Sequence, residues 1–168
     1  VRLQQGPDQE RAQDSTLVVG QTGQHLLINK AQGFSHFGTI AIDVNLTDLD
    51  RRIMEVRETL PVKPGPLTLL YPRWLPGSHS PSGSVTKLAG LRITANGKPI
   101  EWTRDTLDVY AFHLNVPTDV SVLNIAFQHL SPVSSAAGRV VMTQEIIGLQ
   151  WNTVVLYPAG HYASAIQT

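Results

Sequence analysis

The chain of 168 residues contains no cysteine, so it forms no disulfide and offers no thiolate ligand to a metal. It lacks any run of about 18 apolar residues, which is the length that a membrane-spanning helix needs. Neither sign of charge is in excess, because 13 basic residues stand against 13 acidic ones, and no basic stripe suits a nucleic acid. We therefore expect no nucleic-acid partner and no membrane span.

Motifs for metal or nucleophilic catalysis are also missing. None of the six histidines is followed by glutamate or has a second histidine three or four positions away, as a helical zinc-peptidase site requires. The serines around His79 do not form the Gly-x-Ser-x-Gly turn of a hydrolase. Scattered histidines could still converge in space, but we expect no catalytic residue and no metal site in this chain.

The sequence does contain a series of short segments in which apolar and polar residues alternate. Period-two alternation places one face of a strand in a core. Asn96-Gly97 suits a two-residue hairpin turn that needs positive φ at both positions. The pattern predicts an all-β fold, an antiparallel β-sandwich of about eight to ten strands with little helix. The expected strands cover residues 39–46, 67–71, 85–95, 98–102, 107–116, 122–130, 140–147 and 150–157.

Two parts of the chain are less regular. Residues 48–60 fit both helical spacing and strand alternation, and propensity alone favours a helix. Residues 1–24 are rich in Gln, Gly, Asp and Arg, which is typical of a disordered leader or linker. We expect the β-sandwich domain to cover residues 25–168, with a first short strand at 25–30 and a last strand that is cut short at the C-terminal end.

A loop rich in proline and glycine follows the apolar run 67–71. Pro72 ends that strand because proline donates no hydrogen bond to a sheet. Trp74 lies inside the loop, where it either covers the rim of the core or contacts another molecule. We expect the first, because aromatic side chains in loops usually find packing.

This loop also carries a resemblance to a known family. The blocks Tyr71-Pro-Arg-Trp-Leu-Pro-Gly-Ser-His79, Leu88-Ala-Gly-Leu91, Asn96-Gly97 with Trp102-Thr-Arg-Asp105, and Leu156-Tyr-Pro-Ala-Gly160 occur in order. Together they resemble the N-terminal domain of the glycyl-aminopeptidase family, zinc metallopeptidases that also carry a PDZ domain. His79 stands where many members have tyrosine. The resemblance runs from about residue 39 to the end of the chain. It implies a strand at residues 48–60, and we follow it there.

The resemblance implies a non-catalytic β domain that packs beside a thermolysin-like catalytic domain and helps to shape its substrate cleft. The parent protein would remove N-terminal Gly or Ala from peptides, hold zinc in its catalytic domain, and be periplasmic or secreted. This chain alone would be no enzyme. Candidates for the cleft or the domain interface are Trp74, Pro76, Gly77, His79 and Tyr110.

Arg104 lies close in sequence to two carboxylates, Asp105 and Asp108, and we expect a structural ion pair among them. Two other functions stay open. Exposed Trp74, Trp102 or Tyr110 could form the stacking platform of a stand-alone module that binds carbohydrate or protein. A closed barrel with a cavity for an apolar ligand is the third possibility.

Overall fold

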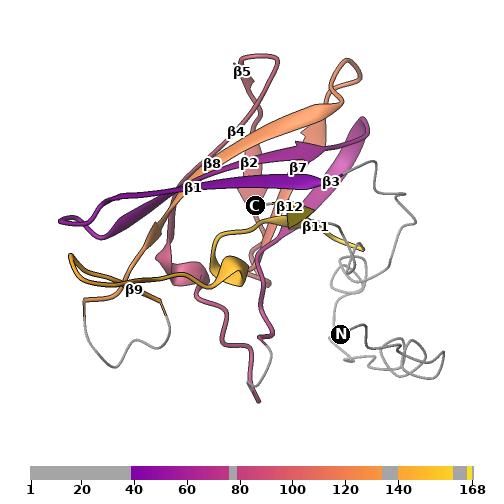
Figure 1. Cartoon of the computed structure of the whole chain (residues 1–168). Coiled ribbons are helices and arrows are strands. Elements are labelled where there is room, and N and C mark those ends of the chain that lie inside the picture. Colours follow the sequence, from indigo (N-terminus) through magenta and orange to yellow (C-terminus); the bar gives the residue numbers. More distant parts are fainter. Residues whose placement is uncertain (1–38, 76–78, 134–139, 161–165, 168) are drawn as a thin grey trace, which may run out of the picture. The chain divides into compact units, whose positions relative to one another are not determined.

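The computed structural model describes residues 39–75, 79–133, 140–160 and 166–167 (Figure 1). The expected leader, residues 1–24, and the expected first strand, residues 25–30, lie outside the described residues. No helix in the described part of the chain is long and apolar enough to cross a membrane.

Two sheets form the framework of the described part of the chain. The larger sheet has six strands in the order β12-β1-β2-β8-β4-β5, and the smaller has four in the order β11-β3-β7-β6. A separate hairpin joins β9 and β10. The strands are β1 (Ile40–Asp48), β2 (Ile53–Pro61), β3 (Gly65–Leu70), β4 (Leu88–Ala95), β5 (Lys98–Pro99), β6 (Trp102–Arg104), β7 (Ala111–Val116), β8 (Val122–Leu130), β9 (Val141–Met142), β10 (Ile147–Gly148), β11 (Tyr157–Pro158) and β12 (Ile166–Gln167).

The three long strands β1, β2 and β8 lie side by side and alternate as the sequence predicts (Figure 1). In β2 the even-numbered positions from Met54 to Leu60 are buried and the odd-numbered ones from Glu55 to Thr59 are exposed. The ambiguous segment 48–60 is therefore a turn followed by a strand. Burial of one complete face against a second sheet outweighs the weak helical spacing.

One core fills the space between the two sheets. Apolar side chains of the larger sheet, such as Val56 and Ile125, belong to the same buried cluster as Leu69 and Phe112 of the smaller one. The predicted all-β sandwich is confirmed. A smaller apolar cluster of Met54, Val140 and Met142 lies where β2 meets the segment of the β9–β10 hairpin.

The structure corrects several strand boundaries. Twelve strands are described, of which five are only two residues long, rather than eight to ten. Residues 140–147 form the β9–β10 hairpin, and residues 150–157 form a 3-10 turn, η2 (Trp151–Thr153), before the short β11. Another 3-10 turn, η1 (Val85–Lys87), precedes β4, and a loop replaces the predicted start of β7.

The return from the Asn96-Gly97 hairpin also differs. Both turn residues have positive φ, 50° and 75°, as predicted. The predicted strand 98–102 divides into β5, at the edge of the six-stranded sheet, and β6, in the four-stranded sheet. Pro99 is tolerated because β5 lies at the edge of its sheet. The Ile100 N–H still donates to the Ile93 carbonyl oxygen at 2.8 Å, and the chain then crosses to the other sheet.

Candidate functional site

A loop from Pro72 to Gly83 leaves the end of β3 and is closed at its base. The Gly83 N–H donates to the Arg73 carbonyl oxygen at 3.0 Å. A Cβ atom at Gly83 would overlap the Pro72 carbonyl oxygen, so only glycine allows the two ends of the loop to approach this closely. Two interface candidates, Pro76 and Gly77, lie outside the described residues and stay predictions.

Two tyrosines brace the base of this loop. The buried Tyr71 hydroxyl donates to the Thr153 carbonyl oxygen at 2.9 Å and lies 3.2 Å from the Ser84 hydroxyl. The Tyr110 hydroxyl donates to the Gly83 carbonyl oxygen at 3.0 Å. Burial raises the pKa of Tyr71 to about 12, so the hydroxyl keeps its proton and stays a donor at physiological pH.

Arg73 joins this loop to the neighbouring loop before β7. Its guanidinium carbon lies 5.6 Å from the centre of the Tyr110 ring, and its Nη1 atom lies 3.5 Å from Asp108 Oδ2. Asp108 Oδ1 in turn accepts a hydrogen bond from the Tyr110 N–H at 3.1 Å. The two loops therefore hold each other through a cation–π contact and an ion pair. Tyr110, predicted as an interface residue, is part of the support.

Trp74 does not cover the core. Its side chain is 62% exposed, so the expectation that it packs on the rim is wrong. The neighbouring loop carries Leu107, 64% exposed, and Val109, 47% exposed. We call these three residues the Trp74 edge. His79, another interface candidate, is also exposed. Large apolar side chains that stay in water on a braced support are typical of a surface that contacts another molecule.

Arg104 does not form the predicted ion pair with Asp105 or Asp108. Among the described residues, Asp105 pairs with His113 at 2.9 Å and Asp108 pairs with Arg73. The Arg104 guanidinium lies over the Phe112 ring, 4.9 Å from its centre. The reason is the register of β6 on β7, which sets Arg104 opposite Phe112 and Thr103 opposite His113. Neighbouring residues of a strand point to opposite faces.

A chain of polar contacts that the sequence did not predict lies on the outer face of the four-stranded sheet. The Thr68 hydroxyl lies 3.0 Å from His113 Nδ1, and His113 Nε2 lies 2.9 Å from Asp105 Oδ2. Asp105 also accepts hydrogen bonds from the N–H groups of Leu107 and Asp108, both at 2.8 Å. The Asp108 N–H bond, with the His113 bond next, lowers the pKa of Asp105 to about 2.

This hydroxyl–imidazole–carboxylate chain has the composition of a hydrolase triad. Its contacts nevertheless suit a structural role, since they tie β3, β7 and the loop before β7 together. No signal in the sequence could have found it, because it depends on Thr68 lying opposite His113 in the ladder of β3 and β7.

A carboxyl group and an imidazole are also buried in the core. Glu58 points inward from β2, where its Oε2 atom accepts a hydrogen bond from the Leu156 N–H at 3.0 Å. Burial raises the pKa of Glu58 to about 8. His129 lies at the end of β8, and burial lowers its pKa to about 4, with Lys87 adding to the effect. Neither ring nitrogen of His129 has a partner among the described residues.

These groups do not combine into a metal site. In the part of the chain that the structure describes, no three His, Cys, Asp or Glu side chains gather closely enough to hold an ion. The aromatic platform of a stand-alone binding module is not favoured either. Trp102 packs edge-on against Phe112, with ring centres 5.6 Å apart, and Tyr110 braces the loop.

Comparison with known proteins places the fold. Residues 41–168 match the family described as the Peptidase M61 N-terminal domain. A crystal structure of an aminopeptidase N family protein from Idiomarina loihiensis is similar, with a TM-score of 0.59 and 18% identity over 73% of this chain. The matched region is 20% of that protein, so the chain spans about a fifth of its length. No curated protein matches the sequence.

Proposed function

Because the chain belongs to the Peptidase M61 N-terminal domain family, we propose that it is the non-catalytic N-terminal β domain of a zinc aminopeptidase. In this proposal it packs against the catalytic domain of the same polypeptide through the Trp74 edge and helps to shape the cleft for the peptide substrate. The observation that carries the proposal is the exposed Trp74 on a loop closed at Gly83 and braced by Tyr110.

The geometry of the loop suits docking for an energetic reason. A tryptophan side chain can bury roughly 150–250 Å² against a partner, which is worth about 4–6 kcal/mol at about 25 cal/mol per Å². Much of that gain is lost when a flexible loop must first be ordered. Here the Arg73–Asp108 pair and the Tyr110 hydrogen bond hold the base of the loop in place before any partner arrives.

The chemistry of the parent protein follows from the family resemblance. We infer that the catalytic domain holds zinc and removes N-terminal Gly or Ala from peptides, that a PDZ domain accompanies it, and that the protein is periplasmic or secreted. The donor groups of the described residues do not fit a zinc site. The ligands for the metal would therefore come from the catalytic domain, and the residues of this chain would only position it.

The test compares the 168-residue chain with the longer polypeptide that includes the catalytic domain. We expect stoichiometric zinc and hydrolysis of Gly- and Ala-anilides from the longer polypeptide only. Hydroxyl-radical footprinting read by mass spectrometry should show Trp74 and Leu107 protected there and oxidised in the short chain. Val122, exposed at the far end of β8, is the control and should be oxidised in both. Anilide hydrolysis by the short chain, or equal oxidation of Trp74 in both, would contradict the proposal.

A further inference from the structure

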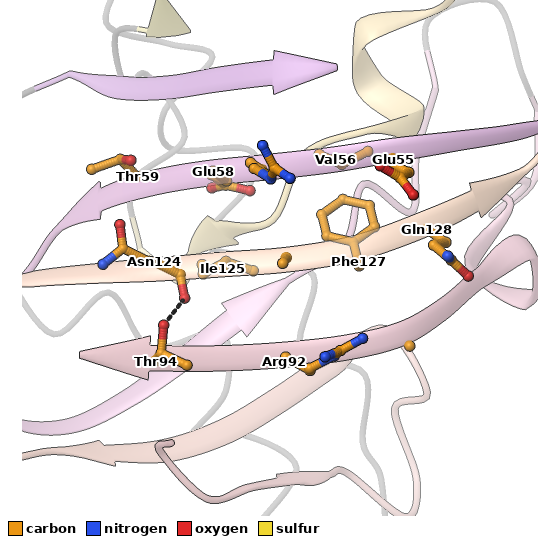
Figure 2. A pocket seen from close by; sticks show the side chains of 13 residues that line it. Glu55, Val56, Glu58, Thr59, Arg92, Thr94, Asn124, Ile125, Phe127 and Gln128 are labelled. Atoms are coloured by element: carbon orange, nitrogen blue, oxygen red, sulfur yellow. Dashed lines mark hydrogen bonds between the residues drawn. The ribbon is translucent and has the colours of Figure 1, made fainter. Parts of the chain in front are cut away.

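The outer face of the six-stranded sheet carries a groove that the proposed docking does not use. It has a volume of about 560 Å³ and lies over β2, β8 and β4 (Figure 2). That volume is within the range of sites for small ligands. The side chains that project from the three strands here are almost all polar, whereas the opposite face of the same strands is the apolar core.

The middle of the groove is a row of three residues in register. Ala126 of β8 lies opposite Arg57 of β2 on one side and opposite Arg92 of β4 on the other. Neighbouring strands are about 4.8 Å apart, so the two arginine backbones are separated by roughly 10 Å. The short side chain of Ala126 leaves the space between them open, and both guanidiniums can reach into it.

The β4 side of the groove contains an irregularity of the backbone. The register of β4 on β8 shifts between Ala89 and Arg92, and Gly90 within this bulge has a φ of 61°. A Cβ atom at Gly90 would meet only the Gln128 Oε1 atom, at 3.9 Å. Bulges of this kind redirect the side chains beside them. Here the bulge immediately precedes Arg92, which lies along the groove in Figure 2.

Neither Arg57 nor Arg92 forms an ion pair with another described residue. The remaining charges near the groove limit what it can bind. Glu55 lines one end, and Asp43 of β1 lies opposite Arg57 in the ladder. These two carboxylates would repel a ligand with many negative charges. A ligand with a single carboxylate fits the arrangement, because two guanidiniums can contact its two oxygens.

We propose that this groove binds the free C-terminal carboxylate of a peptide, held between Arg57 and Arg92 above Ala126. The next row along the strands supplies groups that suit the rest of such a ligand. Thr59, Asn124 and Thr94 lie side by side across β2, β8 and β4. The Thr94 hydroxyl donates to the Asn124 carbonyl oxygen at 3.4 Å and can still accept from a peptide N–H. The Thr59 hydroxyl and the Asn124 amide can both donate to peptide C=O groups and accept from peptide N–H groups. In Figure 2 the three side chains lie at the same end of the groove.

The test uses three N-acetylated tripeptides and the 168-residue chain, followed by ¹⁵N NMR titration or calorimetry. The first is N-acetyl-trialanine with a free carboxylate, the second is its C-terminal amide, and the third is an amide with one internal glutamate. We expect the free carboxylate to bind, with shifts centred on Ala126, and the amide to bind at least about 10-fold more weakly. Equal binding of the internal glutamate peptide would overturn the assignment to a C-terminus.

Three variants define the site. Arg57→Gln and Arg92→Gln should each weaken binding about 10-fold or more, because each removes one side of the clamp. Ala126→Leu keeps both charges, points outward, and should abolish binding by filling the gap. Arg51→Gln is the matched control, since Arg51 is exposed in the turn after β1 and pairs with Asp48. Absence of binding, or an equal loss in Arg51→Gln, would overturn the proposal. The readout is independent of domain docking, so the two can fail separately.

Discussion

Glu58 is a carboxyl group on the buried face of a central strand. Its Oε2 atom is bonded to the Leu156 N–H, and its Oε1 atom has no partner among the described residues. An ionised carboxylate in such surroundings is costly, whereas a protonated one keeps the hydrogen bond from Leu156. Glu58 therefore connects the segment before β11 to β2, and its ionisation makes the free energy of unfolding depend on pH.

We predict that Glu58 lowers the free energy of unfolding as pH rises from about 4.5 to about 8. His129 opposes this fall below pH 6.5, so the net decrease is clearest above that pH. The pKa of Glu58 is about 8 in the folded chain against an ordinary value of 4.5, so unfolding releases a proton in this window. Below it Glu58 is protonated in both states, and above it the stabilisation is lost. The fall should amount to about 3–5 kcal/mol. Glu58→Gln keeps an acceptor for Leu156 and should remove the fall of the unfolding free energy in urea between pH 6.5 and 9. A fall that persists over this range in Glu58→Gln would contradict the prediction.

His129 should give the opposite slope on the acid side. Its pKa is about 4 when folded against an ordinary value of 6.5, so unfolding takes up a proton as pH falls through this window. The contribution of the uncharged His129 to the free energy of unfolding is fully present above pH 6.5 and is lost as pH falls through 4. His129→Leu should remove the His129 contribution and leave only the fall due to Glu58 between pH 4.5 and 6.5. At pH 7 the substitution should cost less than about 1 kcal/mol, because it removes buried polar atoms without a described partner. Asp105→Asn is the control, since the pKa of Asp105 is about 2 and its contribution is lost only below pH 4.

The roles of single residues were the part that the sequence predicted least well. Trp74 could be identified in the sequence as a large aromatic residue in a loop rich in proline and glycine. Whether its side chain faces the core or water depends on how the loop closes. Arg104 was predicted to pair with nearby carboxylates, yet in the folded chain Asp105 pairs with His113 and Asp108 pairs with Arg73. Register is set by pairings between distant segments, and a local pattern does not contain it.

At the scale of elements, the loop from Pro72 to Gly83 is the feature most sensitive to one atom. Gly83→Ala should destabilise the chain by about 2–4 kcal/mol, because the new methyl group overlaps backbone and not a side chain that can rotate away. The Arg73–Gly83 and Tyr110–Gly83 hydrogen bonds would break together. Urea unfolding measures the loss, and limited proteolysis should show faster cleavage between residues 72 and 83. Gly97→Ala, at an open turn position with positive φ, should cost only about 1 kcal/mol and leave this loop intact. If the two variants behave alike, the close approach at Gly83 is not what holds the loop.

Elements were predictable where alternation is long and one face is buried. β1, β2 and β8 fulfil both conditions, and the Asn96-Gly97 turn was found from its two residues alone. The strand predictions for residues 140–147 and 150–157 were wrong because the apolar side chains there are buried individually against the sandwich. Met142 and Leu156 are examples, and they do not belong to one buried face of a long strand. An apolar run has the same appearance in both cases.

At the scale of the whole molecule, the sandwich has faces with different properties. The core is sealed between two sheets, the outer face of the larger sheet is polar, and the Trp74 edge keeps large apolar groups in water. An apolar edge that is largely exposed adds little to the stability of the domain that carries it, since it buries only part of its area on folding. Its expected effect is therefore on a partner.

The substitution Trp74→Ala separates an effect on the stability of this domain from an effect on its partner. In the 168-residue chain it should change the free energy of unfolding by less than about 0.5 kcal/mol, because the side chain is mostly exposed. In the longer polypeptide it should lower kcat/KM for Gly- and Ala-anilides about 10-fold or more, because a small displacement of a cleft wall misplaces the substrate. Val122→Ala is the matched control. Val122 pairs with Pro61 just before β3 begins, so it lies at the end of the sandwich away from Trp74. Its substitution should leave kcat/KM unchanged. Equal activity of Trp74→Ala and Val122→Ala would show that the Trp74 edge has no part in the active site.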